Sequence, residues 1–384
     1  MMFDTPTVIE NPTPASVVAL EAVVRTSEVP EVAMLAAEVL PDGSLSMGRA
    51  RLIELTSRAG GSLRVTAMPD HVRISLTVLP ADLDAGAQAM RALIAEPEFR
   101  QDSVELAAAN LPFRNRSYWD EALNPWRPNY AALGPRAGET LAEYWKAAAR
   151  PERIAIAVGG GFRPGEGKAA VERAFQGWTP PKPSNRRMPV ATSQPLTARR
   201  FPISTWEIEG PALTPTAPEL PANIVATILL GVGKKGLLYT TVREKLGLTY
   251  RQEALLTPTP SGFAVRLIVA RSGSLVPLDE GVAKALEDGI GRWTEADLVR
   301  ARGLLAGIEE GTFPVSPFTL SGSVPVSKGL ADDTFLLAYS TQKFGKAGSW
   351  GDTLKAASTS SLEAVKAAAL SIVRSPVRRK IIGA

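Results

Sequence analysis

The sequence has 384 residues, of which 45% are hydrophobic and 21% are charged. This balance is typical of globular proteins and excludes wholesale disorder, and the length predicts two or three domains at about 150 residues per domain. The 43 basic and 39 acidic residues leave a net charge of +4. Because the basic residues are scattered along the chain, we expect no nucleic-acid partner.

Residue counts also exclude several catalytic chemistries. Without cysteine the chain has no disulfide, no thiolate zinc site and no cysteine nucleophile. A single histidine, His71, cannot supply the two histidines of an H-E-x-x-H or H-x-x-E-H zinc site. An autonomous hydrolase with a nucleophile, base and acid set is therefore the least favoured interpretation.

The sequence shows neither a membrane span nor a signal peptide. No segment reaches the roughly 18 to 20 uninterrupted apolar residues that a span needs, and the N-terminus lacks a basic region followed by an apolar one. We therefore expect no membrane partner. The expected location is cytoplasmic for the sequence as given, and periplasmic or exported if a signal peptide has been trimmed.

Hydrophobic periodicity predicts a compact α/β first half. The turn Met68-Pro69-Asp70 predicts a hairpin between two of its strands, and Thr140 with Glu143 forms a capping box that predicts a helix start. In chain order we expect a strand over 15–24, helices over 30–40 and 45–59, strands over 62–67 and 72–79, helices over 82–95 and 141–149, and a strand over 154–158.

A proline-rich stretch between Gln176 and Arg200 has the composition of a linker, and beyond it the same order of elements returns. A second capping box, Ser360 with Glu363, opens the last helix. Further on we expect a strand over 224–230, a helix over 236–246, a turn over 257–262, a strand over 263–270, a helix over 362–373 and a strand over 377–382. This internal repeat predicts two similar domains, residues 1–178 and 201–384, joined by a linker over 179–200.

Two further motifs are interpreted as structural. The glycines between Gly159 and Gly165 follow a strand and precede a helix, but Pro164 stands where G-x-G-x-x-G needs its third glycine. We expect a strand-to-helix turn there and no bound dinucleotide. His71 beside Asp70 is interpreted as a structural residue, with a proton shuttle between the two as the functional alternative.

The segment from Leu229 to Tyr250 combines a glycine-rich turn at Gly231, Gly233 and Gly236 with a helix that carries Arg243. It resembles the C-terminal-domain signature of the insulinase and pitrilysin metallopeptidases, the inverted-motif group that includes the mitochondrial processing peptidase. The resemblance implies that Arg243 and Tyr250, seven residues later, hold the substrate backbone and the reacting carbonyl. It also implies that the glycines let the adjoining loop adapt to a passing peptide.

The resemblance extends over nearly the whole chain, but the zinc motif of the family is missing. Its H-x-x-E-H helix should fall within 32–40, where Glu38 overlays the catalytic glutamate while Leu35 and Val39 stand at the two histidine positions. The third ligand, a glutamate, falls near Pro112. We therefore expect no zinc and no other cofactor in this chain.

The fold that the resemblance implies has two homologous α/β (α+β) domains, each a mainly antiparallel sheet covered by helices. The implied function is that of a non-catalytic subunit of a heterodimeric metallopeptidase, which binds an unfolded peptide beside a homologous H-x-x-E-H subunit that holds the zinc. The alternative is a peptide-binding or scaffold protein without an enzymatic partner, either as a single chain or as a homodimer.

Overall fold

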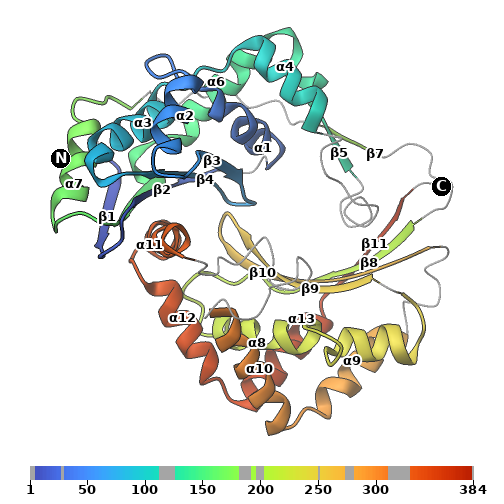
Figure 1. The fold of residues 1–384 in the computed structure, drawn as a ribbon. Helices are drawn as coiled ribbons and strands as arrows, with labels where there is room; N and C mark the ends of the chain where they lie inside the picture. The colour runs from blue at the N-terminus through green and yellow to red at the C-terminus, as the bar shows by residue number, and fades with distance from the viewer. Residues whose placement is uncertain are drawn as a thin grey trace. The chain divides into compact units, whose positions relative to one another are not determined.

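The computed structural model describes residues 5–26, 30–111, 126–180, 192–195, 203–249, 251–272, 281–309 and 329–382. The chain forms two compact units (Figure 1). The first unit comprises Met1–Arg114, Pro128–Thr192 and Ser327–Ser349, and the second comprises Asn115–Arg127, Ser193–Val326 and Trp350–Ala384. Each contains a mainly antiparallel sheet covered by helices, which confirms the predicted α/β fold class.

Within the described residues, the first unit has a sheet with the order β1-β6-β2-β4-β3. β1 pairs with β6 in parallel and the other pairs are antiparallel. The strands are β1 (Thr7–Pro12), β2 (Val18–Arg25), β3 (Arg64–Ala67), β4 (His71–Val78) and β6 (Ile154–Gly160). Alternate β2 residues such as Leu20 and Ala22 point into the main hydrophobic core, because successive side chains in a strand point to opposite faces.

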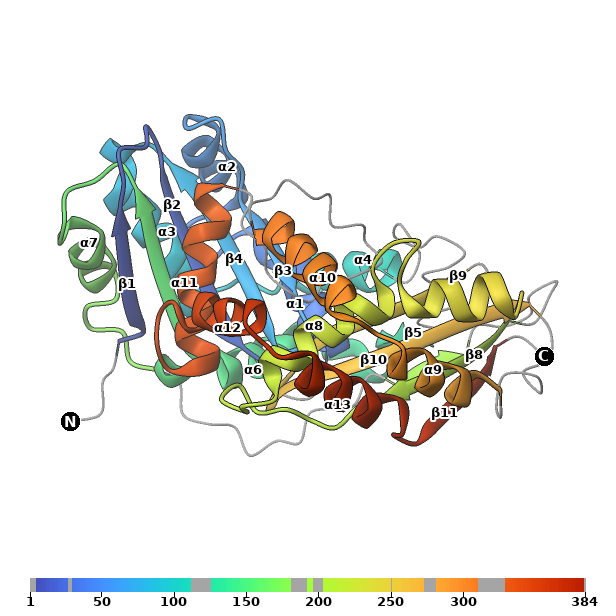
Figure 2. The same ribbon diagram turned by 90° about the horizontal axis from the view of Figure 1, so that it is seen from below.

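Helices cover both faces of this sheet. The helices formed by the earlier part of the chain are α1 (Pro30–Val39), α2 (Arg49–Ser57), α3 (Leu83–Ala95), α4 (Gln101–Asn110), α6 (Ala137–Ala148) and α7 (Glu166–Ala174), with short 3-10 turns at Leu40–Asp42, Pro80–Asp82, Tyr130–Arg136 and Pro151–Arg153. They build the main core on one face. A helix from much later in the chain, α11 (Leu330–Phe344), lies on the opposite face across β2 and β6 (Figure 2).

Small side chains let α11 approach the sheet closely. Ala19 on β2 pairs with Gly159 on β6, and Ala157 stands two residues before Gly159 on the same face. A Cβ on Gly159 would overlap the hydroxyl of Thr334, which itself donates a 2.7 Å hydrogen bond to the Leu330 carbonyl. The glycine therefore sets how near the helix can lie.

In the second unit the described strands form an antiparallel sheet with the order β11-β8-β10-β9. Its strands are β8 (Ile203–Glu209), β9 (Arg251–Thr259), β10 (Gly262–Ser272) and β11 (Val377–Ile382). Its helices are α8 (Leu220–Gly231), a π-helical turn (Tyr239–Lys245), α9 (Gly281–Gly291), α10 (Glu295–Glu309), α12 (Ser349–Ser358) and α13 (Leu362–Val373). No helix among the described residues is long and apolar enough to cross a membrane.

One predicted strand is wrong: residues 224–230 lie in α8. Pro221 stands in its first turn, where proline is favoured, and every residue from Ala222 to Leu230 is buried. A helix that is apolar on all sides shows no 3.6-residue period, so its sequence looks like a buried strand.

Two predicted capping boxes are also displaced. Thr140 lies inside α6, which begins at Ala137. The N-cap of α13 is Ser361 and not Ser360, and its hydroxyl accepts a 3.2 Å hydrogen bond from the Ala364 amide.

The predicted second domain began at residue 201, whereas Ser327–Ser349 within that range groups with the first unit. In the predicted linker, residues 181–191 and 196–200 lie outside the described residues, and β7 (Thr192–Pro195) forms a two-stranded sheet with β5 (Trp126–Asn129). The exact domain bounds and the internal repeat stay predictions.

The contact between Gly159 and Thr334 predicts a specific coupling between two substitutions. Gly159→Ala should lower the free energy of unfolding by about 1 to 3 kcal/mol, because the new methyl group overlaps the Thr334 hydroxyl. Combining it with Thr334→Ala should recover at least part of that loss. Chemical denaturation of the wild type, both single variants and the double variant measures the coupling. Strictly additive effects would show that α11 does not rest on Gly159.

Candidate functional site

The two positions of α1 that were predicted to match the histidines of the zinc motif are part of the hydrophobic core. Leu35 is 0% exposed and Val39 is 1% exposed, and both pack with the apolar residues of the first unit. Aliphatic side chains have no lone pair to offer a metal, so these two positions cannot ligate zinc. Glu38 is half-buried on the same helix, and Pro112 lies outside the described residues. In the described part of the chain, no three His, Asp or Glu side chains group as a metal site.

The predicted glycine-rich loop follows α8 in the second unit. A Cβ on Gly231 would lie 2.6 Å from the Ala254 Cβ, so a glycine is needed where the end of α8 meets β9. Gly233 has φ +70°, in the left-handed region that glycine favours, and Gly236 lies against the Gly231 backbone. These contacts explain the glycines as packing and turn residues, and their adaptation to a peptide stays a prediction.

Arg243 lies on the π-helical turn Tyr239–Lys245. The Leu246 amide bonds the Thr241 carbonyl at 3.0 Å, five residues back, and such turns occur frequently at functional sites. The Arg243 guanidinium carbon is 4.8 Å from the centre of the Tyr239 ring, a cation–π contact. Tyr250 lies outside the described residues, so its convergence with Arg243 stays a prediction.

The glycine cluster after β6 is a structural turn, as its failed motif spacing predicts. Gly165 has φ +89° and immediately precedes α7. The Glu10 carboxylate on β1 accepts hydrogen bonds from the Gly165 amide at 2.6 Å and the Lys168 amide at 3.0 Å. The position where a phosphate would bind a helix N-terminus therefore holds a carboxylate of the same chain.

His71 is buried between β4 and α11. It is 2% exposed, its Nδ1 atom lies 2.8 Å from Asp70 Oδ1, and its ring contacts Phe335 and Tyr339 with centroids 5.7 and 5.3 Å apart. Lys343 Nζ binds the other Asp70 oxygen at 2.7 Å. An imidazole enclosed in this way anchors α11 and has little access to a substrate, which favours the structural interpretation of His71.

Burial has opposite outcomes for the pKa values of Asp70 and Lys343 in this cluster: neighbouring groups outweigh it for Asp70 but not for Lys343. Burial alone would raise the pKa of Asp70, but the hydrogen bond from His71 and the charges of His71 and Lys343 outweigh it and hold this pKa below its usual value. For Lys343, burial dominates and lowers the pKa even though Asp70 opposes the shift. We interpret Asp70 as the anionic centre of the cluster, because the His71 ring nitrogen faces one of its oxygens and the Lys343 ammonium faces the other.

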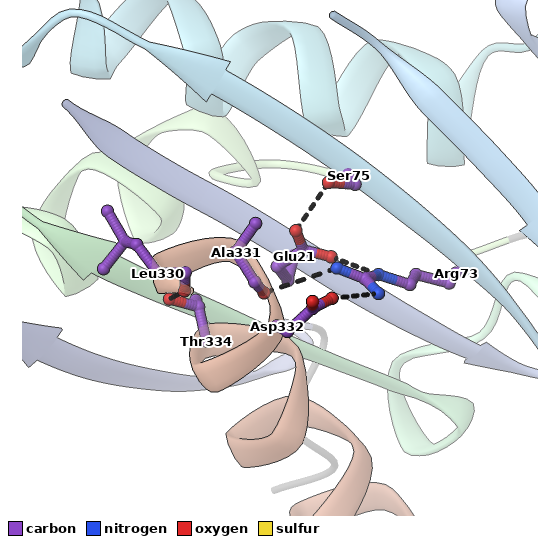
Figure 3. A network of polar contacts seen from close by, with 7 residues as sticks. All are labelled: Glu21, Arg73, Ser75, Leu330, Ala331, Asp332 and Thr334. Carbon is purple, nitrogen blue, oxygen red and sulfur yellow. Dashed lines mark hydrogen bonds and ion pairs between the residues drawn. The ribbon is translucent and has the colours of Figure 1, made fainter. Parts of the chain in front are cut away.

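A second polar network, which sequence patterns did not single out, joins the middle of β2 to the start of α11 (Figure 3). Glu21 is 0% exposed, and its carboxylate accepts from Arg73 Nε at 2.8 Å and Ser75 Oγ at 2.5 Å. Arg73 also donates to Asp332 Oδ1 at 2.9 Å and stacks on the Phe335 ring at 4.2 Å. One guanidinium thus bridges a strand carboxylate and a helix carboxylate.

Burial raises the pKa of Glu21 to about 7, although Arg73 and Ser75 both oppose the shift. Burial alone would lower the pKa of Arg73. The hydrogen bonds and charges of Glu21 and Asp332 outweigh burial and raise this pKa. The guanidinium therefore stays charged, and Glu21 is the member of the network that gains or loses a proton near neutral pH.

Comparisons with known proteins bear on the resemblance and on the fold. Residues 138–305 match the family model described as the peptidase M16 inactive domain. The predicted resemblance to the insulinase and pitrilysin metallopeptidases is confirmed. Over residues 138–305 the chain is similar to this inactive domain, and its sequence contains no H-x-x-E-H motif. None of the curated proteins compared with the chain matches it.

Solved structures share the fold over almost the full chain. A peptidase M16 inactive domain from Pseudomonas fluorescens has a TM-score of 0.73 at 16% identity, covering 99% of this chain and 95% of the other. A protease from Helicobacter pylori has a TM-score of 0.73 at 12% identity, covering 100% and 98%. A putative M16-like peptidase from Alicyclobacillus acidocaldarius gives 0.67 at 13%, covering 99% and 96%. At these identities the likeness establishes the fold alone.

The raised pKa of Glu21 predicts an unusual pH dependence of stability. Its folded-state pKa of about 7 exceeds the usual 4.5, so its favourable contribution is complete below pH 4.5 and is lost as the pH rises through 7. The full loss is about 3 kcal/mol, at 1.36 kcal/mol per pKa unit. In Glu21→Gln this loss should disappear. Chemical denaturation between pH 4.5 and 8 measures both proteins.

Glu139→Gln is the matched control, because Glu139 is exposed in the same unit. Wild type and control should lose stability relative to Glu21→Gln over this range. Parallel stability profiles for all three proteins would contradict the assignment of this proton to Glu21.

Proposed function

We propose that the chain is the non-catalytic subunit of a heterodimeric M16-type metallopeptidase. A homologous subunit with an intact H-x-x-E-H motif would hold the zinc, and this chain would contribute binding groups for an unfolded peptide. The observation that carries the proposal is the burial of Leu35 and Val39 in the core of the first unit, in a chain whose fold is similar to that of a peptidase M16 inactive domain. A single substitution could not create a zinc site there, because aliphatic side chains stand at both expected histidine positions.

Arg243 supplies the chemistry that this role needs. A guanidinium presents a rigid fork of donors that fits a peptide carbonyl or carboxylate, and the Tyr239 ring limits the positions that it can take. In the proposed complex Tyr250 donates its phenol hydrogen to the oxyanion that develops on the reacting carbonyl. Binding and oxyanion stabilisation would thus come from this chain, and the activated water from the partner.

The competing function is that of a peptide-binding or scaffold protein, either as a single chain or as a homodimer. Both functions use the same peptide-binding groups, and they differ in whether peptide turnover depends on them. The discriminating experiment is therefore kinetic and uses the chain reconstituted with a homologous H-x-x-E-H subunit from the same source. The isolated chain should retain no stoichiometric zinc after dialysis and should cleave no peptide.

Substitutions at the two binding residues should impair the reconstituted enzyme in different ways. Tyr250→Phe should lower kcat by roughly a hundredfold to a thousandfold, the usual effect of losing an oxyanion donor. Arg243→Ala should also raise KM, because it removes a ground-state anchor of the peptide. Steady-state kinetics on a fluorogenic peptide measures both effects.

Lys245→Ala is the control, since Lys245 is an exposed cation on the same π-helical turn. It should leave both constants close to those of the wild type, and all variants should still form the complex. Wild-type kinetics for both Arg243→Ala and Tyr250→Phe would favour the scaffold function.

A further inference from the structure

A polar pocket of about 570 Å³ opens on the α11 face of the first sheet. Its floor is formed by β3 and β4, one rim by Gly60–Ser62, and the other rim by Ala331 and Asp332 in the first turn of α11. All of these residues belong to the first unit. The pocket is distinct from the zinc-motif positions of α1 and from Arg243.

Strand register explains why the pocket floor is polar. Arg64 on β3 pairs with Ser75 on β4, and Thr66 pairs with Arg73, so these four side chains share one face. Thr77 continues the same face of β4, where Gly61 passes so close that an added Cβ would lie 2.7 Å from the Thr77 Cβ. Hydroxyl and guanidinium groups therefore line the pocket.

Some of these donors already have partners and others do not. Arg73 binds Glu21 and Asp332, and Ser75 binds Glu21. Arg64 bonds the Ser62 hydroxyl through Nε at 3.4 Å, but no carboxylate of the described residues lies within ion-pair distance of it. Within the same described set, the hydroxyls of Thr66 and Thr77 form no hydrogen bond. The pocket thus offers a surplus of donors.

We propose that this pocket binds a carboxylate group, anchored by Arg64 and supported by the hydroxyls of Thr66 and Thr77. A guanidinium can hold a carboxylate through two parallel hydrogen bonds. The lining keeps only a small positive charge, because Asp332 and the partly ionised Glu21 carboxyl beneath Arg73 offset most of the charge of the two arginines, which favours a singly charged carboxylate over a phosphate dianion. The carboxylate comes from a small organic acid or from an acidic peptide side chain. This inference does not depend on a partner subunit.

The test measures binding to the whole chain by calorimetry and by NMR shifts. The probes are butyrate, its neutral analogue butyramide, inorganic phosphate, and an acetylated peptide amide with one central glutamate. Butyrate or the peptide should bind saturably and butyramide should not, with shifted amides at 60–66, 75–77 and 331–332. The tighter of the two binders identifies the source of the carboxylate.

Arg64→Gln should weaken binding at least tenfold, the usual effect of losing a charge-assisted hydrogen bond. Thr66→Val should weaken it less, and Arg136→Gln, which removes another exposed arginine of the same unit, should leave it within twofold. All three positions are exposed, so these variants should fold. The proposal would be overturned if neither carboxylate bound, or if Arg64→Gln bound them as tightly as the wild type. Tighter binding of phosphate than of either carboxylate would also overturn it.

Discussion

The buried carboxylate of Glu21 determines, through Arg73, where α11 packs on the sheet of the first unit. A charge in the middle of a sheet is tolerated only where it is paired and hydrogen-bonded, and Arg73 and Ser75 meet that requirement. Arg73 is itself balanced by Asp332 on α11, so the helix position is tied to the strand charge. At the other end of the helix, Lys343 binds Asp70. The Arg73–Asp332 and Asp70–Lys343 ion pairs thus set the position of α11 along the sheet. The small side chains beneath the helix would not do so by themselves.

The same unit has aliphatic side chains where the resemblance places the two histidines of a zinc site. Leu35 and Val39 are buried in the core, so α1 contributes to stability at these positions. The groups that we propose to bind ligands are both hydrogen-bond donors: Arg243 on its π-helical turn and Arg64 in the first unit. In the proposed complex this chain binds and orients the peptide, and the bond-breaking step is left to another subunit.

Short sequence patterns predicted much of the fold, because the elements they predict depend on residues that are close together in the chain. The amphipathic helix α3, the hairpin of β3 and β4, and the strand β6 lie close to the expected ranges. Helix α8 was missed because burial on every side removes its periodicity. The Glu21 network was missed because its partners lie 52, 54 and more than 250 residues away. A single glutamate in the apolar run Val18–Val24 was the one available signal, since a buried charge requires a partner.

In the proposed complex this chain works beside a zinc-bearing homologue. Native mass spectrometry of the chain isolated from its source, with metal analysis of the same sample, tests this assembly directly. We expect a one-to-one complex with a homologous subunit that contains H-x-x-E-H, holding one zinc ion that leaves with the partner when the complex is dissociated. A monomer or homodimer as the sole species, or one zinc ion that stays with this chain, would contradict it.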